Sequence, residues 1–196
     1  MSITYICLPM ACVRKITRVT ARKRRKHKYV YLVANSVAEG QGAWRDLLGG
    51  KGAGLAEMTA LRIRVPLGCT ISTEAYRAYA AAGNRYPEGI WDELLVVLQK
   101  IEQVVGMAFG ARRRPLLLSV CSGARESMPG MMDMVLNIGL NDERVQGLMQ
   151  ISHNPRFAYD SYRRFITMFG NVVRVPHAAF EALLKEVKKR KGARAE

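Results

Sequence analysis

The feature that most limits the possible folds is an amphipathic helix pattern between residues 90 and 105. Its apolar residues recur every three or four positions, at Ile90, Leu94, Val97, Leu98, Ile101 and Val105. This spacing places them on one face of a helix, and Gly106 follows where a glycine commonly ends one. Two short apolar runs, Tyr29–Val33 and Leu116–Cys121, have the length and composition of strands. The chain is therefore predicted to be α+β.

Start and stop signals predict further helices, most of them in the second half of the chain. Polar residues that can cap a helix stand ahead of apolar positions at helical spacing. The predicted helices run from Ser72 or Thr73 to Ala82, from Glu143, capped by Asp142, to Ser152, from Asn154 to Met168, and along Phe180–Val187. The second half is therefore expected to be rich in helix.

Basic charge is concentrated near the start of the chain. The formal net charge is +15, but nine basic residues lie between Arg14 and Lys28, and the first acidic residue is Glu39. Outside that run, 22 basic and 16 acidic residues leave a mildly basic body. We therefore divide the chain into a basic extension, residues 1–27, and a folded domain, residues 28–196. The extension is interpreted as disordered, with an organelle transit peptide as the alternative.

Cysteine and histidine spacing argues against several kinds of site. Neither a zinc ribbon nor a disulfide framework is predicted, which favours a reducing compartment. No run approaches the ~20 apolar residues of a membrane span. We assign no metal ligand and no membrane partner, and expect a cytoplasmic location, with a plastid or mitochondrion as the alternative. The four cysteines (Cys7, Cys12, Cys69 and Cys121) and the three histidines (His27, His153 and His177) are scattered along the sequence.

A glycine-rich turn, Gly49-Gly50-Lys51-Gly52, precedes a helical pattern. Glycines allow a backbone to approach an anion, a helix N-terminus offers unpaired N–H groups, and lysine adds a positive charge. The turn lacks the G-x-x-x-x-G-K-[ST] spacing of a P-loop. The pattern alone therefore leaves both phosphate binding and an ordinary turn open.

A second polar segment, Ser122–Asp133, follows the Leu116–Cys121 run and contains hydroxyls, glycines, an arginine and a carboxylate. Hydroxyls and glycines ahead of Arg125 suit the wrapping of a polyphosphate. The methionines of the same segment suit ordinary core packing. Spacing does not decide between these interpretations.

Four ordered blocks resemble the amino-terminal region of the pyruvate, phosphate dikinases. They are LLGGKGAGLAEM at 47–58, VPLGCTISTEAY at 65–76, SGARESMPGMMDMVLNIGLND at 122–142 and RFAYDSYRRFITMFGNVV at 156–173. The resemblance runs from about Lys28 to the end of the chain and covers a minor fraction of the family enzyme. It implies an incomplete ATP-grasp amino-terminal subdomain.

In that family, the ATP-grasp domain passes the β-phosphoryl group of ATP to a histidine on a central domain. A carboxyl-terminal barrel then uses the group to interconvert pyruvate and phosphoenolpyruvate. The resemblance implies Mg-ATP as the nucleotide and gives Lys51 the catalytic role of holding its phosphates. The implied nucleotide-binding residues are Gly49, Gly50, Gly52, Ser122, Gly123, Arg125, Ser127, Met128, Gly130, Met131 and Asp133.

The sequence departs from the family at Cys121, where the dikinases have an arginine directly before Ser-Gly-Ala. Cysteine supplies neither the charge nor the forked geometry with which arginine stabilises phosphoryl transfer. The resemblance places the acidic metal ligands and the phosphorylated histidine in later segments, so this chain is assigned neither. We therefore expect an ATP-binding portion of a dikinase that does not turn over alone.

Two other functions stay open. A split-gene subunit or regulator would pair with a partner chain that supplies the rest of the ATP-grasp domain, the phosphohistidine domain and the barrel. A nucleic-acid binder would act through the basic segments Arg14–Lys28 and Lys185–Arg194. No RNA-binding motif accompanies these segments, so nucleic acid is the less favoured partner.

Overall fold

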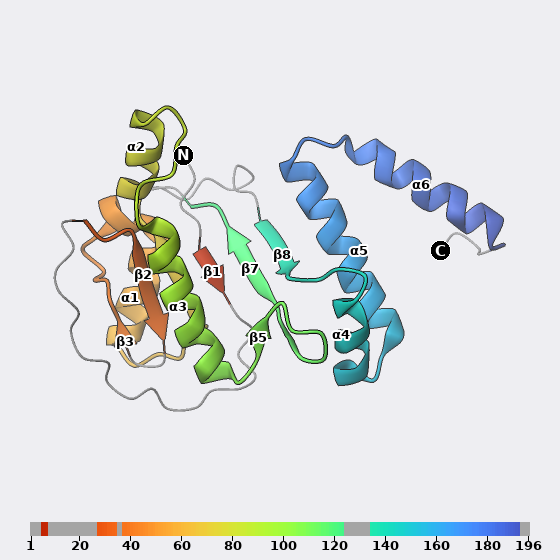
Figure 1. Ribbon diagram of the computed structural model, residues 1–196, viewed down its shortest axis with the longest axis horizontal. Coiled ribbons are helices and arrows are strands. Elements are labelled where there is room, and N and C mark those ends of the chain that lie inside the picture. The colour runs from red at the N-terminus through yellow and green to blue at the C-terminus, as the bar shows by residue number, and fades with distance from the viewer. Residues whose placement is uncertain (1–4, 8–26, 35–36, 124–133, 193–196) are drawn as a thin grey trace.

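The computed structural model describes residues 5–7, 27–34, 37–123 and 134–192, and its centre is a six-stranded antiparallel sheet (Figure 1). The strand order is β3-β2-β4-β1-β7-β8. A separate parallel pair joins β5, Ala108–Phe109, to β6, Pro115–Leu116. The strands of the main sheet are β1 Tyr5–Cys7, β2 Val30–Ala34, β3 Val37–Ala38, β4 Gly68–Ile71, β7 Leu118–Cys121 and β8 Met134–Ile138.

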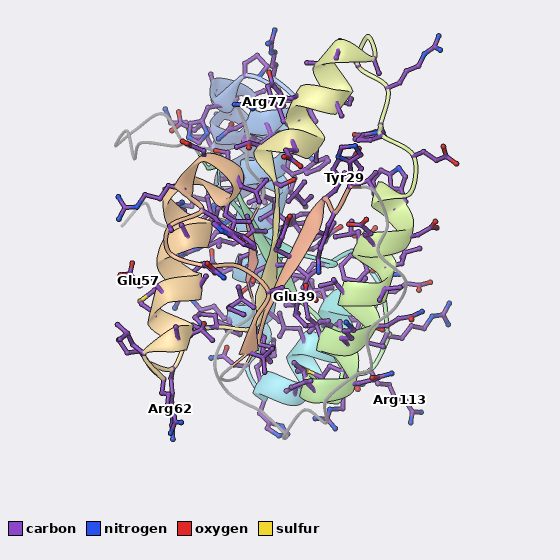
Figure 2. All side chains as sticks on the ribbon, turned by 90° about the vertical axis from the view of Figure 1, so that its left-hand side faces the viewer. Tyr29, Glu39, Glu57, Arg62, Arg77 and Arg113 are labelled. Atoms are coloured by element: carbon purple, nitrogen blue, oxygen red, sulfur yellow. The ribbon has the colours of Figure 1, made fainter. Side chains whose placement is uncertain are left out.

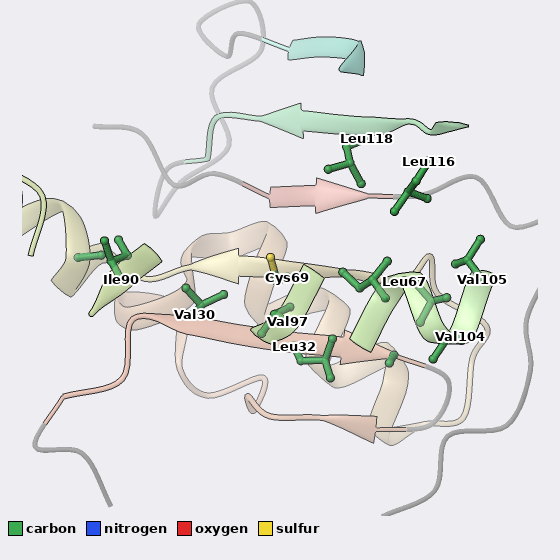
Figure 3. Close-up of a cluster of buried hydrophobic side chains, with 13 residues drawn as sticks. Val30, Leu32, Leu67, Cys69, Ile90, Val97, Val104, Val105, Leu116 and Leu118 are labelled. Atoms are coloured by element: carbon green, nitrogen blue, oxygen red, sulfur yellow. The ribbon is translucent and has the colours of Figure 1, made fainter. Parts of the chain in front are cut away.

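Helix α3, Ile90–Val105, covers one face of the sheet and forms the main core with it (Figure 3). Gly89 and Gly106 flank this helix, with φ of 81° and 71° in the left-handed region. The bounds predicted from the apolar periodicity are therefore confirmed. The buried core includes Val30, Leu32, Cys69 and Leu118 from the strands, Leu67 just before β4, and Ile90, Val97 and Ile101 from α3.

Helix α1, Arg45–Ala60, lies on the opposite face of the sheet from α3 (Figure 2). A small second core joins Leu48 and Ala53 of this helix to Tyr31 of β2. Helix α2, Thr73–Ala81, follows β4 directly and begins as predicted, because the Ser72 hydroxyl accepts a hydrogen bond from the Ala75 amide at 3.4 Å. The first half of the chain is thus a sheet between two helical layers.

Three helices follow β8: α4, Arg144–Ser152, α5, Pro155–Val172, and α6, His177–Arg190. Helix α5 packs along β8 and against α4, and α6 contacts α5. Asn154 caps α5 by accepting from the Phe157 amide at 3.0 Å. The helix-rich second half is confirmed, as is the mixture of helix and strand, whereas the ATP-grasp assignment stays a prediction.

Strand β1 lies within the segment interpreted as a disordered extension. Tyr5–Cys7 instead pair with β4 on one side and β7 on the other. Tyrosine and isoleucine are favoured in strands, so this short run can pair with the β4 and β7 strands on either side of it. The other residues before His27 lie outside the described part of the chain, and the domain boundary near Lys28 stays a prediction.

Two smaller differences concern the ends of helices. The N-cap of α4 is Glu143, not Asp142, and in the preceding turn the side-chain oxygen of Asn141 accepts from the Arg144 amide at 2.8 Å. The Asp142 carboxylate instead accepts from the Tyr162 hydroxyl at 3.0 Å. Helix α5 continues to Val172, four residues beyond the predicted end at Met168.

Candidate functional site

The glycine-rich turn interrupts α1 at Gly49. This residue has φ of 69° and ψ of 171°, a combination that essentially only glycine adopts. A new helical segment therefore starts at Gly50, and its first backbone N–H groups lack a preceding turn to donate to. Lys51 is exposed in this first turn, at the positive end of the helix dipole. The predicted glycine loop entering a helix is instead a kink within α1, after which a second helical segment starts.

Gly52 fixes that first turn against the sheet. A side-chain Cβ at this position would lie 2.8 Å from both the Cγ2 and the Oγ1 atoms of Thr70, on β4. It would also lie 3.1 Å from the Cβ of Leu48. Ordinary carbon contacts are about 3.5 to 4.0 Å, so the close packing of α1 on β4 requires glycine here.

A second contact shows which edge of the sheet the start of α1 occupies. The Thr73 hydroxyl, just after β4, donates to the Asp46 carbonyl at 2.6 Å. Strands β4 and β7 run in the same direction, because both are antiparallel to β1 between them. The start of α1 therefore lies at the edge where β4 and β7 both end, the edge that carries α2 in Figure 1.

The strand register also places Cys121 on the same face of the sheet as α1. Tyr5 pairs with Thr70 on one side and with Cys121 on the other. Directly paired residues project from the same face, and Thr70 contacts α1. Two strand spacings separate Thr70 from Cys121, about 9 to 10 Å. Cys121 and the glycine turn are thus brought to one edge and one face of the sheet.

The predicted second loop is described only at its beginning. Cys121 is the buried last residue of β7, Ser122 is half-buried and Gly123 is buried. The structure brings these residues to the edge that holds Gly49, Gly50, Lys51 and Gly52. The remaining predicted residues, Arg125, Ser127, Met128, Gly130, Met131 and Asp133, lie outside the described residues, and their roles stay predictions.

Comparison with curated proteins finds long matches at high identity. The chain is 54% identical over 166 residues to pyruvate, phosphate dikinase 1, chloroplastic, of Oryza sativa subsp. japonica. It is 52% identical over 168 residues to the Arabidopsis thaliana protein of that name, and 53% over 169 residues to pyruvate, phosphate dikinase 2 of Zea mays. This chain is homologous to one part of the pyruvate, phosphate dikinases. The matches cover 84–86% of the chain but only 17–19% of each dikinase. No family model matches the chain.

The described residues of this dikinase homologue contain no group of three or more histidine, cysteine, aspartate or glutamate side chains arranged to hold a metal ion. None of the helices in the same described ranges is long and apolar enough to cross a membrane.

An open depression of about 780 Å³ lies along α5, away from the glycine turn, and it was not expected from the sequence. Within it, Asp160 accepts from Arg163 and from Arg164, each at 2.7 Å. The hydrogen bonds from Arg163, with a smaller contribution from Arg164, hold the pKa of Asp160 below its ordinary value. Asp-x-x-Arg-Arg at helical spacing is a detectable signal, but exposed ion pairs of this kind contribute little stability.

The residue that sequence reasoning missed is Thr70. It lies within the VPLGCTISTEAY block, but nothing in that block distinguishes it from a neighbouring strand residue. Its position beneath the glycine turn follows only from the pairing of β4 and the packing of α1.

Proposed function

We propose that this chain binds the phosphates of ATP where the start of α1 meets the end of β7, as the ATP-binding portion of a dikinase-like phosphotransferase. Homology to the dikinases supports the class of reaction. The observation that carries the site is the close contact of Gly52 with Thr70, which holds the glycine turn at this edge. An incomplete ATP-grasp subdomain is the fold that we infer from the same homology.

Each part of the turn has a distinct role in this proposal. The Lys51 side chain makes no hydrogen bond or ion pair with the other described residues, so its ammonium group is available to a phosphate oxygen. The N–H groups of Gly50, Lys51 and Gly52 face the same negative charge from the helix end. Ser122 and Gly123, at the end of β7, lie at the same edge of the sheet and are proposed to contact the phosphates. Mg²⁺ would arrive with ATP and supply further neutralisation of charge.

Calorimetric titration with Mg-ATP tests this site. A charge-assisted hydrogen bond contributes about 1.5 to 3 kcal/mol, so Lys51→Ala should weaken binding about ten- to a hundredfold. Lys185→Ala is the matched control, because it removes the same charge from an exposed position on α6. Equal affinities for the wild type and Lys51→Ala would refute the site, and the absence of any binding would refute the proposed function.

Turnover requires more than binding, and we propose that the chain alone does not catalyse the dikinase reaction. Phosphoryl transfer depends on positioning and on charge stabilisation, and Cys121 provides no positive charge. A coupled assay with pyruvate, ATP and phosphate should show no phosphoenolpyruvate formed. Cys121→Arg should strengthen Mg-ATP binding, because it places a guanidinium on the α1 face of the sheet. Unchanged affinity in that variant would count against the role assigned to this position.

The exposed apolar surface of α5 and α6 favours a second proposal, association with a partner chain. Helix α6 has no buried residue, and Leu183 and Val187 are 60% and 48% exposed. On α5, Phe169 is 49% exposed. Exposed large apolar side chains on neighbouring helices commonly pack against another protein surface. The partner would supply the rest of a dikinase-like assembly.

Mixing this chain with a dikinase polypeptide that lacks the corresponding region tests the association. Restored phosphoenolpyruvate formation is expected, and Leu183→Ser should reduce it. Leu95→Ser on α3 is the control, because Leu95 is 54% exposed, close to the 60% of Leu183, and the substitution removes the same apolar side chain. A mixture that stays inactive and sediments as separate species would overturn the partner proposal.

Location is a further part of the proposal. Several relatives are named as chloroplastic, including those from Oryza sativa subsp. japonica and Arabidopsis thaliana. Removal of residues 1–27 as a transit peptide would, however, remove β1 from between β4 and β7. We therefore propose a cytoplasmic location for a chain that keeps its start, with a plastid as the alternative. The N-terminal sequence of protein purified from each compartment distinguishes the two.

A further inference from the structure

The Thr70 hydroxyl is an unusual polar group. Thr70 is 1% exposed, and among the described residues its Oγ1 is the single buried side-chain nitrogen or oxygen atom without a hydrogen-bond partner. Buried hydroxyls are nearly always paired, because an unpaired one has lost its bonds to water without replacement. An exception of this kind calls for a reason beyond packing.

The position of this hydroxyl connects it with the joint in α1. Oγ1 lies 2.8 Å from the point where a Cβ of Gly52 would stand, and Leu48 Cβ lies 3.1 Å from the same point. Leu48 and Gly52 belong to the two helical segments that meet at Gly49. The unpaired hydroxyl therefore lies directly beneath the joint, next to the backbone of the turn.

Gly49 is the point at which the backbone of Gly50 and Lys51 can adjust while Gly52 stays packed on Thr70. Its φ of 69° and ψ of 171° lie outside the helical region, and glycine passes between such conformations at low steric cost. A small rotation at Gly49 would shift the backbone groups of Gly50 and Lys51 relative to β4. Such a shift can bring a carbonyl or N–H group of the turn within reach of Thr70.

We propose that Thr70 is a positioning residue for phosphate binding. Its hydroxyl forms a hydrogen bond to the backbone of the Gly49–Gly52 turn when a bound phosphate draws that turn into place. The unpaired hydroxyl destabilises the turn in its present position and so favours the position that binds phosphate. This inference rests on the proposed function and adds to it a residue that never touches the nucleotide.

Two substitutions separate the hydroxyl from the shape of the side chain. Thr70→Val keeps the shape and removes the hydroxyl, whereas Thr70→Ser keeps the hydroxyl and removes a methyl group. Thermal unfolding and Mg-ATP calorimetry are measured on the whole chain. Thr70→Val should raise Tm by about 2 to 4 °C, because a buried unpaired group is gone. The same variant should bind Mg-ATP about three- to tenfold more weakly.

Thr70→Ser should have a lower Tm than the wild type, because the loss of a buried methyl group costs stability. Its affinity for Mg-ATP should stay within about twofold of the wild type, because the hydroxyl and its hydrogen bond are kept. Thr59→Val is the control. Thr59 is also buried, at 3% exposure, but its hydroxyl already donates to the Leu55 carbonyl at 2.7 Å. Its replacement should lower Tm and leave Mg-ATP affinity unchanged.

The outcomes distinguish this inference from the proposed function. If the wild type does not bind Mg-ATP, the proposed function fails. If the wild type binds and Thr70→Val binds equally well, the positioning role alone fails. A lower Tm for Thr70→Val would show that the hydroxyl already has a partner, which would also overturn the inference.

Discussion

Replacing Gly52 with alanine tests whether the glycine turn is held against β4 as described. Two effects oppose each other in this variant. Alanine in a helix interior is favoured over glycine by about 0.5 to 1 kcal/mol. The added Cβ, however, would lie 2.8 Å from two atoms of Thr70 and 3.1 Å from Leu48 Cβ. Thr70 belongs to a central strand and Leu48 is buried, so neither side chain has room to withdraw.

The magnitude follows from the balance of these two effects. Overpacking of a well-packed site costs about 1 to 3 kcal/mol, which exceeds the gain in helix propensity. Gly52→Ala should therefore lower the free energy of unfolding by about 1 to 2 kcal/mol, or Tm by about 2 to 8 °C for a chain of this size. Gly54→Ala is the matched control, because a Cβ there meets nothing within 4 Å. That variant should gain about 0.5 to 1 kcal/mol.

Urea unfolding followed by circular dichroism measures both variants. A third variant, Gly52→Ala with Thr70→Ala, completes a double-mutant cycle, and it should recover part of the loss because the conflicting atoms are gone. Equal stability for Gly52→Ala and Gly54→Ala would refute the described packing. If the effects of Gly52→Ala and Thr70→Ala on stability were additive, the contact between Gly52 and Thr70 would be refuted.

Three further predictions concern other parts of the structure. Glu93 accepts from the Tyr29 and Val30 amides at 2.8 and 3.0 Å, so Glu93→Ala should lower the free energy of unfolding by about 2 to 3 kcal/mol in urea titrations. Burial raises the pKa of the Cys69 thiol to about 12, so Cys69 should resist iodoacetamide at pH 8 until the chain unfolds, as peptide mass mapping would show. The pKa of Asp160 is lower in the folded chain than in the unfolded chain. The ionised carboxylate therefore stabilises the folded chain above about pH 4, and this stabilisation is lost as the pH falls through the folded pKa. Asp160→Asn should therefore make the acid loss of stability shallower, and equal slopes in acid titrations would contradict this.

Helices were predictable where the sequence carries local signals at both ends. Helix α3 has apolar periodicity and a glycine on either side, and its bounds agree with the prediction. Helix α5 begins at an Asn-Pro pair that both caps and preorganises its first turn. The strands were less predictable, because β1 and β4 are short and depend on distant partners. Gly68, the first residue of β4, also weakens its strand pattern, since glycine is depleted in strands.

The candidate site was predictable only where its residues form a local pattern in the sequence. Lys51 and its glycines form a local pattern, and the residues after Cys121 form another. The position of Cys121, Ser122 and Gly123 at the edge of the glycine turn depends on β4, β1 and β7 lying side by side in that order, which no local pattern encodes. Thr70 was missed because its significance arises from a tertiary contact with Gly52 and not from its neighbours in sequence.

The place of β1 in the sheet has a consequence for the order of folding. This strand is synthesised first, yet both strands that pair with it come much later in the chain. Strands β2, β3 and β4 can pair with one another soon after β4 leaves the ribosome, whereas β7 and β8 join them only through β1. Closing such long loops is slow. A nascent chain released before Cys121 would therefore leave unpaired the edge of β1 that β7 covers in the complete sheet, and unpaired edges of this kind favour aggregation.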